Sequence, residues 1–258
     1  PMTLASQRPV EMLLFHTDPT LVAEATEAGI AGFIVDWERR GKARRQVGQG
    51  TQINHDTLAD LARVRAATAA RVLCRVNGFG PWTRREIDCA VDAGADELLL
   101  PMVHNPREVD RALKMVAGRC GLGILIETQA GVRATPELVR RPLSRVYVGL
   151  NDLRIDRGSS DLFEPLIDGT VEHVRSYVDG PRFGVAGLTL PDLGAPIPSR
   201  LLAAELVRIR ADFAADGHMS LDLETQLTLA PRLQQDLVLP PVEFSPRRRP
   251  PRSCGWPA

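Results

Sequence analysis

Two carboxylate side chains in this sequence stand directly after apolar segments. Glu127 ends GLGILIE (residues 121 to 127), and Asp152 follows RVYVGL (residues 145 to 150). The two lie 25 residues apart, about one strand and one helix, so we expect them at the ends of neighbouring strands. Two carboxylates that close repel each other unless a cation lies between them. Because hard divalent ions take oxygen ligands, often one or two protein carboxylates, the pair predicts a Mg²⁺ or Mn²⁺ site.

Arg75, near the end of RVLCRVNG (residues 71 to 78), adds a permanent positive charge. Its guanidinium keeps its proton and offers a planar fork of donors to a carboxylate or an enolate oxygen. A metal ion and an arginine together stabilise negative charge that develops on oxygen. Each residue alone has a structural alternative, such as an ion pair of Glu127 with Arg75, or Asp152 capping its own loop. The occurrence of all three at strand ends favours a functional site.

The elements that must position these residues alternate between short apolar strands and longer helical segments. The strands are apolar on both faces, which indicates a parallel sheet covered by helices. At 258 residues the chain fits an α/β protein of one domain, a closed (β/α)8 TIM barrel over residues 1–240, better than an open doubly wound sheet. The predicted strands are residues 11–16, 32–38, 71–78, 97–103, 121–127, 145–150 and 182–190, with a weaker eighth at 218–224. The predicted helices are residues 18–29, 57–68, 83–94, 105–118, 165–178 and 198–217, and one near 136–142.

A barrel of this type carries its active site at the carboxyl ends of the strands. Polar residues gather at those ends in this sequence, so we expect them on one rim. They are His16, Asp36, Glu38, Arg75, Asn77, His104, Glu127, Asn151 and Asp152.

The segment from 39 to 50, after the second predicted strand, is strongly basic. Its cations are Arg39, Arg40, Lys42, Arg44 and Arg45. Placed over the rim, they would bind a phosphate or a polycarboxylate through charge-assisted hydrogen bonds. The alternative is that these residues lie on an ordinary solvated surface, as runs of charged residues usually do.

The composition limits the classes of partner. Lysine plus arginine equals aspartate plus glutamate at 32 each, so no net field attracts nucleic acid or an anionic membrane. The four cysteines form no C-x-x-C pair, no run of about 18 apolar residues occurs, and no secretion signal is visible, which favours a cytoplasmic protein. Residues 241–258 are rich in proline and arginine and are predicted to form a tail outside the barrel.

Several strings together resemble a known family. ELLLPMV followed by NPREVDRAL, then LIET, YVGLNDL and GLTLPDLGAPIPS, is similar to the HpcH/HpaI aldolase and citrate lyase beta-subunit family of the phosphoenolpyruvate/pyruvate superfamily, over residues 11–217. The resemblance implies a divalent-metal-dependent lyase that makes or breaks a carbon–carbon bond beside a carbonyl, through a metal-bound enolate. It also implies a homo-oligomer, in which the helix at 198–217 could take part.

The resemblance assigns roles residue by residue. Glu127 and Asp152 match the metal-binding carboxylates, and Arg75 matches the arginine that steadies the enolate oxygen. Asp36 and Glu38 match the acidic pair after the second strand. Backbone amides around Asn151 and Asp152 would hold the substrate carboxylate, while Lys42 and Arg45 are further substrate-binding candidates from the basic segment.

The departures from the family pattern concern the general base and the neighbouring strands. Arg39 stands where the pyruvate aldolase branch carries a histidine of its base system, and Leu125 stands where that branch has glutamine. Met102 follows Pro101 where the citrate lyase branch usually has lysine. His16 is the best-placed substitute base, followed by His55 and His104, because an imidazole exchanges protons near neutral pH.

Three hypotheses about function follow. The leading one is an aldolase-type lyase that uses Mg²⁺ or Mn²⁺ and acts on pyruvate or a related 2-oxoacid. A second is a Claisen-type lyase that cleaves a coenzyme A ester such as citryl- or malyl-coenzyme A, although no adenine-nucleotide signature is visible. A third is a barrel that has lost catalysis and only binds a metal or an oxoacid.

Overall fold

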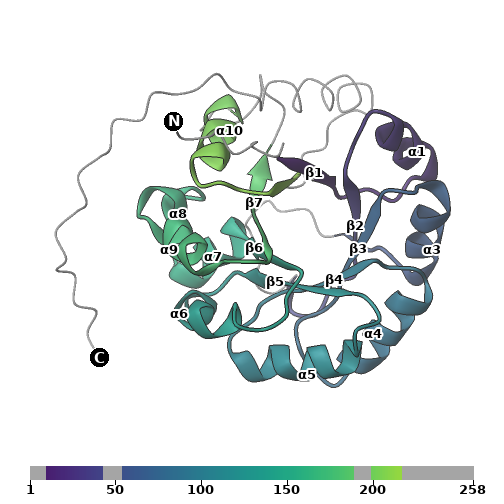
Figure 1. Cartoon of the computed structure of the whole chain (residues 1–258), viewed down its shortest axis with the longest axis horizontal. Coiled ribbons are helices and arrows are strands. Elements are labelled where there is room, and N and C mark those ends of the chain that lie inside the picture. Colours follow the sequence, from purple (N-terminus) through teal and green to yellow (C-terminus); the bar gives the residue numbers. More distant parts are fainter. Residues whose placement is uncertain (1–9, 43–53, 189–198, 217–258) are drawn as a thin grey trace, which may run out of the picture.

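Eight parallel strands close into a barrel in the order β1 to β8, with helices around the outside (Figure 1). The computed structural model describes residues 10–42, 54–188 and 199–216. The fold therefore confirms the predicted (β/α)8 TIM barrel. The strands are β1 (Glu11–Leu14), β2 (Gly32–Asp36), β3 (Arg71–Arg75), β4 (Glu97–Leu100), β5 (Gly121–Ile126), β6 (Arg145–Val148), β7 (Arg182–Leu188) and β8 (Phe213–Asp216).

The helices begin where the sequence supplies caps. Asp18 accepts hydrogen bonds from two N–H groups of the first turn of α1, and Asn105 does the same for α5, each followed by proline at the first helical position. None of the helices that the structure describes has the length and apolar character needed to span a bilayer. The helices are α1 (Pro19–Glu27), α3 (Leu58–Ala67), α4 (Thr83–Asp92), α5 (Pro106–Val116), α6 (Gln129–Leu138), α7 (Leu150–Arg157), α8 (Glu164–Ile167), α9 (Thr170–Tyr177) and α10 (Ser199–Arg208).

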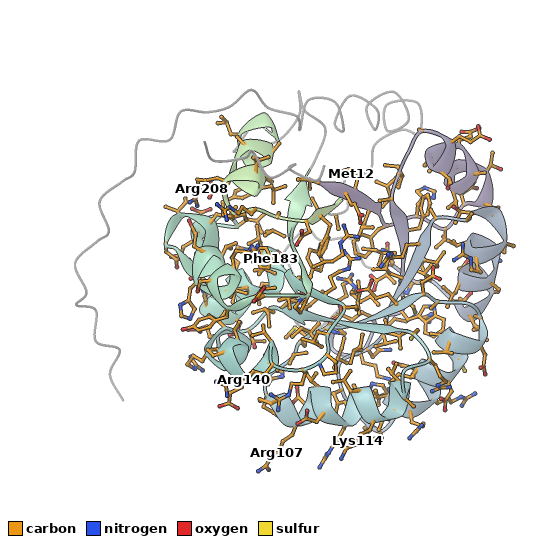
Figure 2. All side chains as sticks on the ribbon, in the orientation of Figure 1. Met12, Arg107, Lys114, Arg140, Phe183 and Arg208 are labelled. Carbon is orange, nitrogen blue, oxygen red and sulfur yellow. The ribbon has the colours of Figure 1, made fainter. Side chains whose placement is uncertain are left out.

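Side chains fill the space inside the ring of strands (Figure 2). Those that point into the barrel come from alternate positions along the strands. One apolar layer crosses its middle and consists of Leu13, Ile34, Leu73, Leu99, Leu125, Tyr147, Phe213 and Ala215. Asp36, Arg75 and Glu127 each lie two residues beyond a member of this layer, so the strand period aims them inward at the carboxyl-terminal mouth. This alternation positions the site.

A buried ion pair lies in the inward positions below the apolar layer, which sequence analysis did not predict. The guanidinium of Arg145 donates from Nε to Glu97 Oε1 at 3.0 Å and from Nη2 to Oε2 at 3.2 Å. Both residues are at most 1% exposed. Gly123 makes room for them, because a Cβ atom there would lie 3.0 Å from the Arg145 Cβ. The amino-terminal end of the barrel is therefore held by charge as well as by apolar packing.

The eighth strand differs from the prediction. It is β8, which pairs with β1 and β7, whereas residues 213–216 were assigned to the end of a helix at 198–217. The segment FAAD suits either period, and pairing with both neighbouring strands decides in favour of a strand. The strand predicted at 218–224 and the tail at 241–258 lie outside the described residues.

Candidate active site

An arginine–aspartate pair lies at the carboxyl-terminal mouth of the barrel. Asp36 and Arg75 end β2 and β3 and are paired in register. Arg75 donates from Nε to Asp36 Oδ1 at 2.9 Å and from Nη2 to Oδ2 at 2.7 Å. The ring of Phe15 lies 4.9 Å from Arg75 Cζ. The pair with Asp36 uses two of the five N–H donors of the guanidinium.

Lys42 joins this pair from the segment after β2. Its ammonium lies 2.9 Å from Asp36 Oδ2 and 3.9 Å from Glu38 Oε2, and the residue is 2% exposed. Lys42 is therefore not part of a solvated surface, because Asp36 of β2 and Glu38 just after it bind its ammonium in the interior. Its predicted role in substrate binding stays a prediction. Arg45, the other basic candidate, lies outside the described residues, as does Arg44.

These contacts set the ionisation of Asp36. Burial opposes its charged form, but the charges and hydrogen bonds of Arg75 and Lys42 outweigh burial and hold the pKa of this carboxyl well below its usual range. Glu38 lies 3.6 Å from Arg75 Nε. Asp36 is therefore a carboxylate throughout the neutral pH range and cannot act there as an acid.

Asn77 fixes the segment that carries Glu38 and Lys42. Its Oδ1 accepts the backbone N–H groups of Arg39 and Arg40 at 2.9 and 2.8 Å. Its Nδ2 donates to Glu86 of α4 at 2.7 Å. Asn77 was noted in the sequence only as a polar residue at a strand end, and the structure shows it as the link between the β2 and β3 loops.

Glu127 follows β5 and is 3% exposed. Its Oε2 accepts the backbone N–H of Met102 at 3.1 Å. On the other side it packs against Gly149, where a Cβ atom would overlap Oε1 and lie 2.6 Å from Cγ. The carboxylate is thus held between the end of β4 and the start of α7, in space that only glycine at position 149 leaves open.

Glu127 and Asp152 are brought together, as predicted from their spacing. Asp152 is 6% exposed and lies in the first turn of α7, which is a correction to its expected place in a loop at a strand tip. Burial, followed by the negative charges of Glu38 and Asp152, raises the pKa of Glu127 to about 8, against the opposing effects of Arg75 and the Met102 N–H. The carboxylates therefore repel one another across a shared buried space.

The donor set fits a hard divalent cation. Among the described residues, four buried carboxylates (Asp36, Glu38, Glu127 and Asp152) and two buried cations (Arg75 and Lys42) lie at this mouth. No group of three or more histidine, cysteine, aspartate or glutamate side chains with metal-binding geometry occurs in the described ranges. Mg²⁺ suits such a site, since it is usually bound through one or two carboxylates with water and substrate completing its shell.

Asn151 also lies in the first turn of α7, with its Oδ1 accepting from Arg154 at 3.1 Å. N–H groups in a first helical turn have no partner within the helix and favour anions. The predicted use of the backbone around Asn151 and Asp152 for a substrate carboxylate has this basis in the local structure, and it stays a prediction.

The histidines are placed less favourably for a base. His16 Nδ1 accepts the backbone N–H of Asp18 at 3.1 Å, and burial lowers its pKa, partly offset by Asp18. Neutral His16 in this conformation therefore carries its proton on Nε2 and presents a donor there, not an acceptor. His104 is exposed beside Glu108, and His55 is exposed. Within the described parts of the chain, no hydrogen bond or ion pair joins these three to the buried carboxylates.

Solved structures share this fold at low sequence identity. An HpcH/HpaI aldolase from Desulfitobacterium hafniense DCB-2 superposes with a TM-score of 0.65 at 17% identity, covering 94% of this chain and 97% of that one. RipC from Yersinia pestis gives 0.60 at 16%, covering 87% and 94%. The citrate synthase SbnG gives 0.59 at 16%, covering 83% and 89%. These likenesses establish the barrel fold.

Comparison at the level of sequence identifies the family. No functionally curated protein matches this chain. The family model described as HpcH/HpaI aldolase/citrate lyase matches residues 12–162, more than half of the chain, and this range holds all the buried charged residues of the candidate site. The chain therefore belongs to the HpcH/HpaI aldolase/citrate lyase family, whose members are lyases of the phosphoenolpyruvate/pyruvate superfamily.

Proposed function

We propose that this chain is a divalent-metal-dependent carbon–carbon lyase of the aldolase type, acting on pyruvate or a related 2-oxoacid. The observation that carries the proposal is the pair of buried carboxylates at the barrel mouth, Glu127 and Asp152, whose negative charges act on each other. The buried guanidinium of Arg75 lies beside them, paired with Asp36. Two buried carboxylates repel each other, and a cation between them relieves this repulsion.

Glu127 and Asp152 would hold Mg²⁺ or Mn²⁺. When bound, the ion would supply a Lewis acid that stabilises negative charge on the oxygens of the substrate. Arg75, kept in place by Asp36, would donate a hydrogen bond to the oxygen that becomes an enolate when the carbon–carbon bond breaks. The N–H groups of the first turn of α7 would receive the substrate carboxylate.

The buried surroundings of these groups strengthen the proposed chemistry. Arg75 and Asp36 are at most 7% exposed, and a hydrogen bond to a developing charge is worth more where water is excluded. Asp36 also fixes the guanidinium by two hydrogen bonds, so Arg75 would meet the substrate in a defined orientation.

The test is Mn²⁺ binding, measured by calorimetry, together with exchange of the pyruvate methyl protons for deuterium, followed by NMR. Glu127→Gln and Asp152→Asn should each reduce Mn²⁺ affinity and slow exchange by about a hundredfold or more. Glu137→Gln is the matched control, because Glu137 is an exposed carboxylate on α6 and should behave as the parent does. Exchange at the parent rate in Glu127→Gln would refute the proposal.

A further inference from the structure

Met102 has an unusual backbone conformation beside the candidate metal site. It follows the end of β4 and has a φ of +53°, in the left-handed region that side chains other than glycine rarely adopt. Its N–H points to Glu127 Oε2 at 3.1 Å. A residue kept in a disfavoured conformation persists only when its surroundings hold it there.

The turn from 101 to 105 is held at several points. The hydroxyl of Thr128 donates to the carbonyl oxygen of Val103 at 3.3 Å and accepts the N–H of Gly131 at 2.9 Å. The N–H of His104 donates to Glu108 at 2.9 Å. A Cβ atom on Gly131 would lie 2.7 Å from the Val103 carbonyl oxygen, so glycine there permits this close approach.

Two hydrogen bonds join consecutive residues of this turn to consecutive residues after β5. The N–H of Met102 donates to Glu127, and the hydroxyl of Thr128 donates to the carbonyl of Val103. The turn after β4 and the start of α6 therefore fix each other's position. On the opposite side, Gly149 lets Glu127 lie against the start of α7. Among the residues that the structure describes, the hydrogen bond to the Glu127 carboxylate comes from this turn.

We infer that Met102 is a positioning residue, whose left-handed backbone directs its N–H to Glu127 Oε2 and so sets the orientation in which that carboxylate meets a divalent cation. The inference rests on the proposed function. Groups that orient a metal ligand commonly change metal affinity when they are altered, although they do not touch the metal.

The test compares Mn²⁺ affinity, measured by calorimetry on the full chain, in variants that differ in their tolerance of the left-handed region. Met102→Ile keeps the N–H but adds a β-branch that disfavours this conformation, and should weaken Mn²⁺ binding by about tenfold or more. Met102→Gly accepts the conformation freely and should bind Mn²⁺ within about twofold of the parent. If Met102→Gly weakened binding as much as Met102→Ile, the side chain and not the backbone would be responsible, and the inference would fail.

Ala117 provides the matched control. It has the same φ of +53° at the exposed end of α5, where its N–H bonds to Leu113, far from the carboxylates along the barrel axis. Ala117→Ile should lower the melting temperature as Met102→Ile does, yet leave Mn²⁺ affinity at the parent value. Equal Mn²⁺ affinity in Met102→Ile, Ala117→Ile and the parent would overturn the inference.

A second variant covers the case in which Met102→Ile does not fold. Thr128→Val keeps Met102 and removes the hydroxyl that holds the Val103 carbonyl, so it should also weaken Mn²⁺ binding. Parent-like binding in this variant would count against the inference. Mn²⁺ binding by the parent protein distinguishes the two proposals. If the parent binds no Mn²⁺, the proposed metal dependence and the role of Met102 both fail. If the parent binds Mn²⁺ and Met102→Ile binds it equally well, only the role of Met102 is refuted.

Discussion

Arg75 donates hydrogen bonds to both carboxylate oxygens of Asp36, from Nε to Oδ1 at 2.9 Å and from Nη2 to Oδ2 at 2.7 Å. The two residues end neighbouring strands, β3 and β2. The carboxylate is 0% exposed and also accepts from the ammonium of Lys42. Asp36 therefore binds two buried cations at once.

Replacing Asp36 with asparagine should strongly destabilise the fold. The change removes the carboxylate that hydrogen-bonds both Arg75 and Lys42 and leaves Glu38, at 3.6 and 3.9 Å, as their neighbouring negative charge. Breaking a buried pair on one side typically costs ~3–5 kcal/mol. The free energy of unfolding in urea measures this. Asp88→Asn is the control, since its pair with Arg119 at 2.6 Å lies at the surface and is worth at most ~1 kcal/mol. Equal losses in the two variants would show that the buried pair has no special weight.

The contribution of Asp36 should depend on pH with a definite sign. Its folded-state pKa is depressed by Arg75 and Lys42 against the effect of burial, whereas in the unfolded chain it titrates near pH ~4. The stabilisation is complete above the unfolded pKa and is lost as the pH falls toward the folded one. The stability difference between the parent and Asp36→Asn should therefore shrink between about pH 6 and about pH 3. Urea unfolding at both pH values measures it, and an unchanged difference contradicts the assignment.

Gly149→Ala should impair metal binding without straining the backbone. The φ of Gly149 is −91°, which alanine adopts freely, but a Cβ atom would lie 2.6 Å from Glu127 Cγ and push this carboxylate aside. We expect Mn²⁺ affinity to fall by about tenfold and pyruvate proton exchange by about a hundredfold. Gly78→Ala is the control, because its Cβ would meet only ordinary contacts, at 3.8 and 3.9 Å. Parent-like Mn²⁺ binding in Gly149→Ala would disprove the steric argument.

The ion pair between Glu97 and Arg145 should matter for stability and not for the site. Glu97→Gln leaves a guanidinium that is 0% exposed without its counter-charge, at a cost of ~3–5 kcal/mol. Its Mn²⁺ affinity should equal that of the parent, because the apolar layer separates this pair from the barrel mouth. A tenfold weaker affinity in Glu97→Gln would show that the two ends are coupled.

Removing both charges of the Glu97–Arg145 pair tests whether the pair itself stabilises the barrel. Arg145 Nη1 finds no hydrogen-bond partner within the described residues, so the pair is not fully satisfied. Glu97→Leu combined with Arg145→Met should therefore cost less stability than Glu97→Gln alone, as urea unfolding would measure. A larger loss in the double variant would mean that the charged pair stabilises the barrel outright.

Much of the site was predictable because strand alternation and parallel topology are local consequences of sequence. Glu127 and Asp152 were expected to converge from their spacing of one strand and one helix, and the structure brings them together. The sequence did not determine which carboxylate pairs with Arg75, since Glu127 and Asp36 both end strands near it. The register between β2 and β3 determines the partner, because it places Asp36 directly beside Arg75.

Other features depend on contacts between segments that are distant in the chain. Lys42 looked like one cation of a basic run, and only the fold shows it buried against Asp36 and Glu38. Glu97 and Arg145 are 48 positions apart and meet because they end up on nearby strands. The Ala-rich segment before residue 217 has no hydrophobic period that distinguishes a helix from a strand. Its pairing with β1 and β7 makes it the strand β8.

The sequence by itself determined the alternation of strands and helices, the barrel class and the rim on which the carboxylates collect, because these follow from hydrophobic period and chain order. The tertiary structure alone decided which charges pair, that Lys42 is buried, and that the left-handed backbone of Met102 faces Glu127. Charge pairing and backbone strain depend on distances of a few ångströms between different strands, and no local pattern in one chain carries that information.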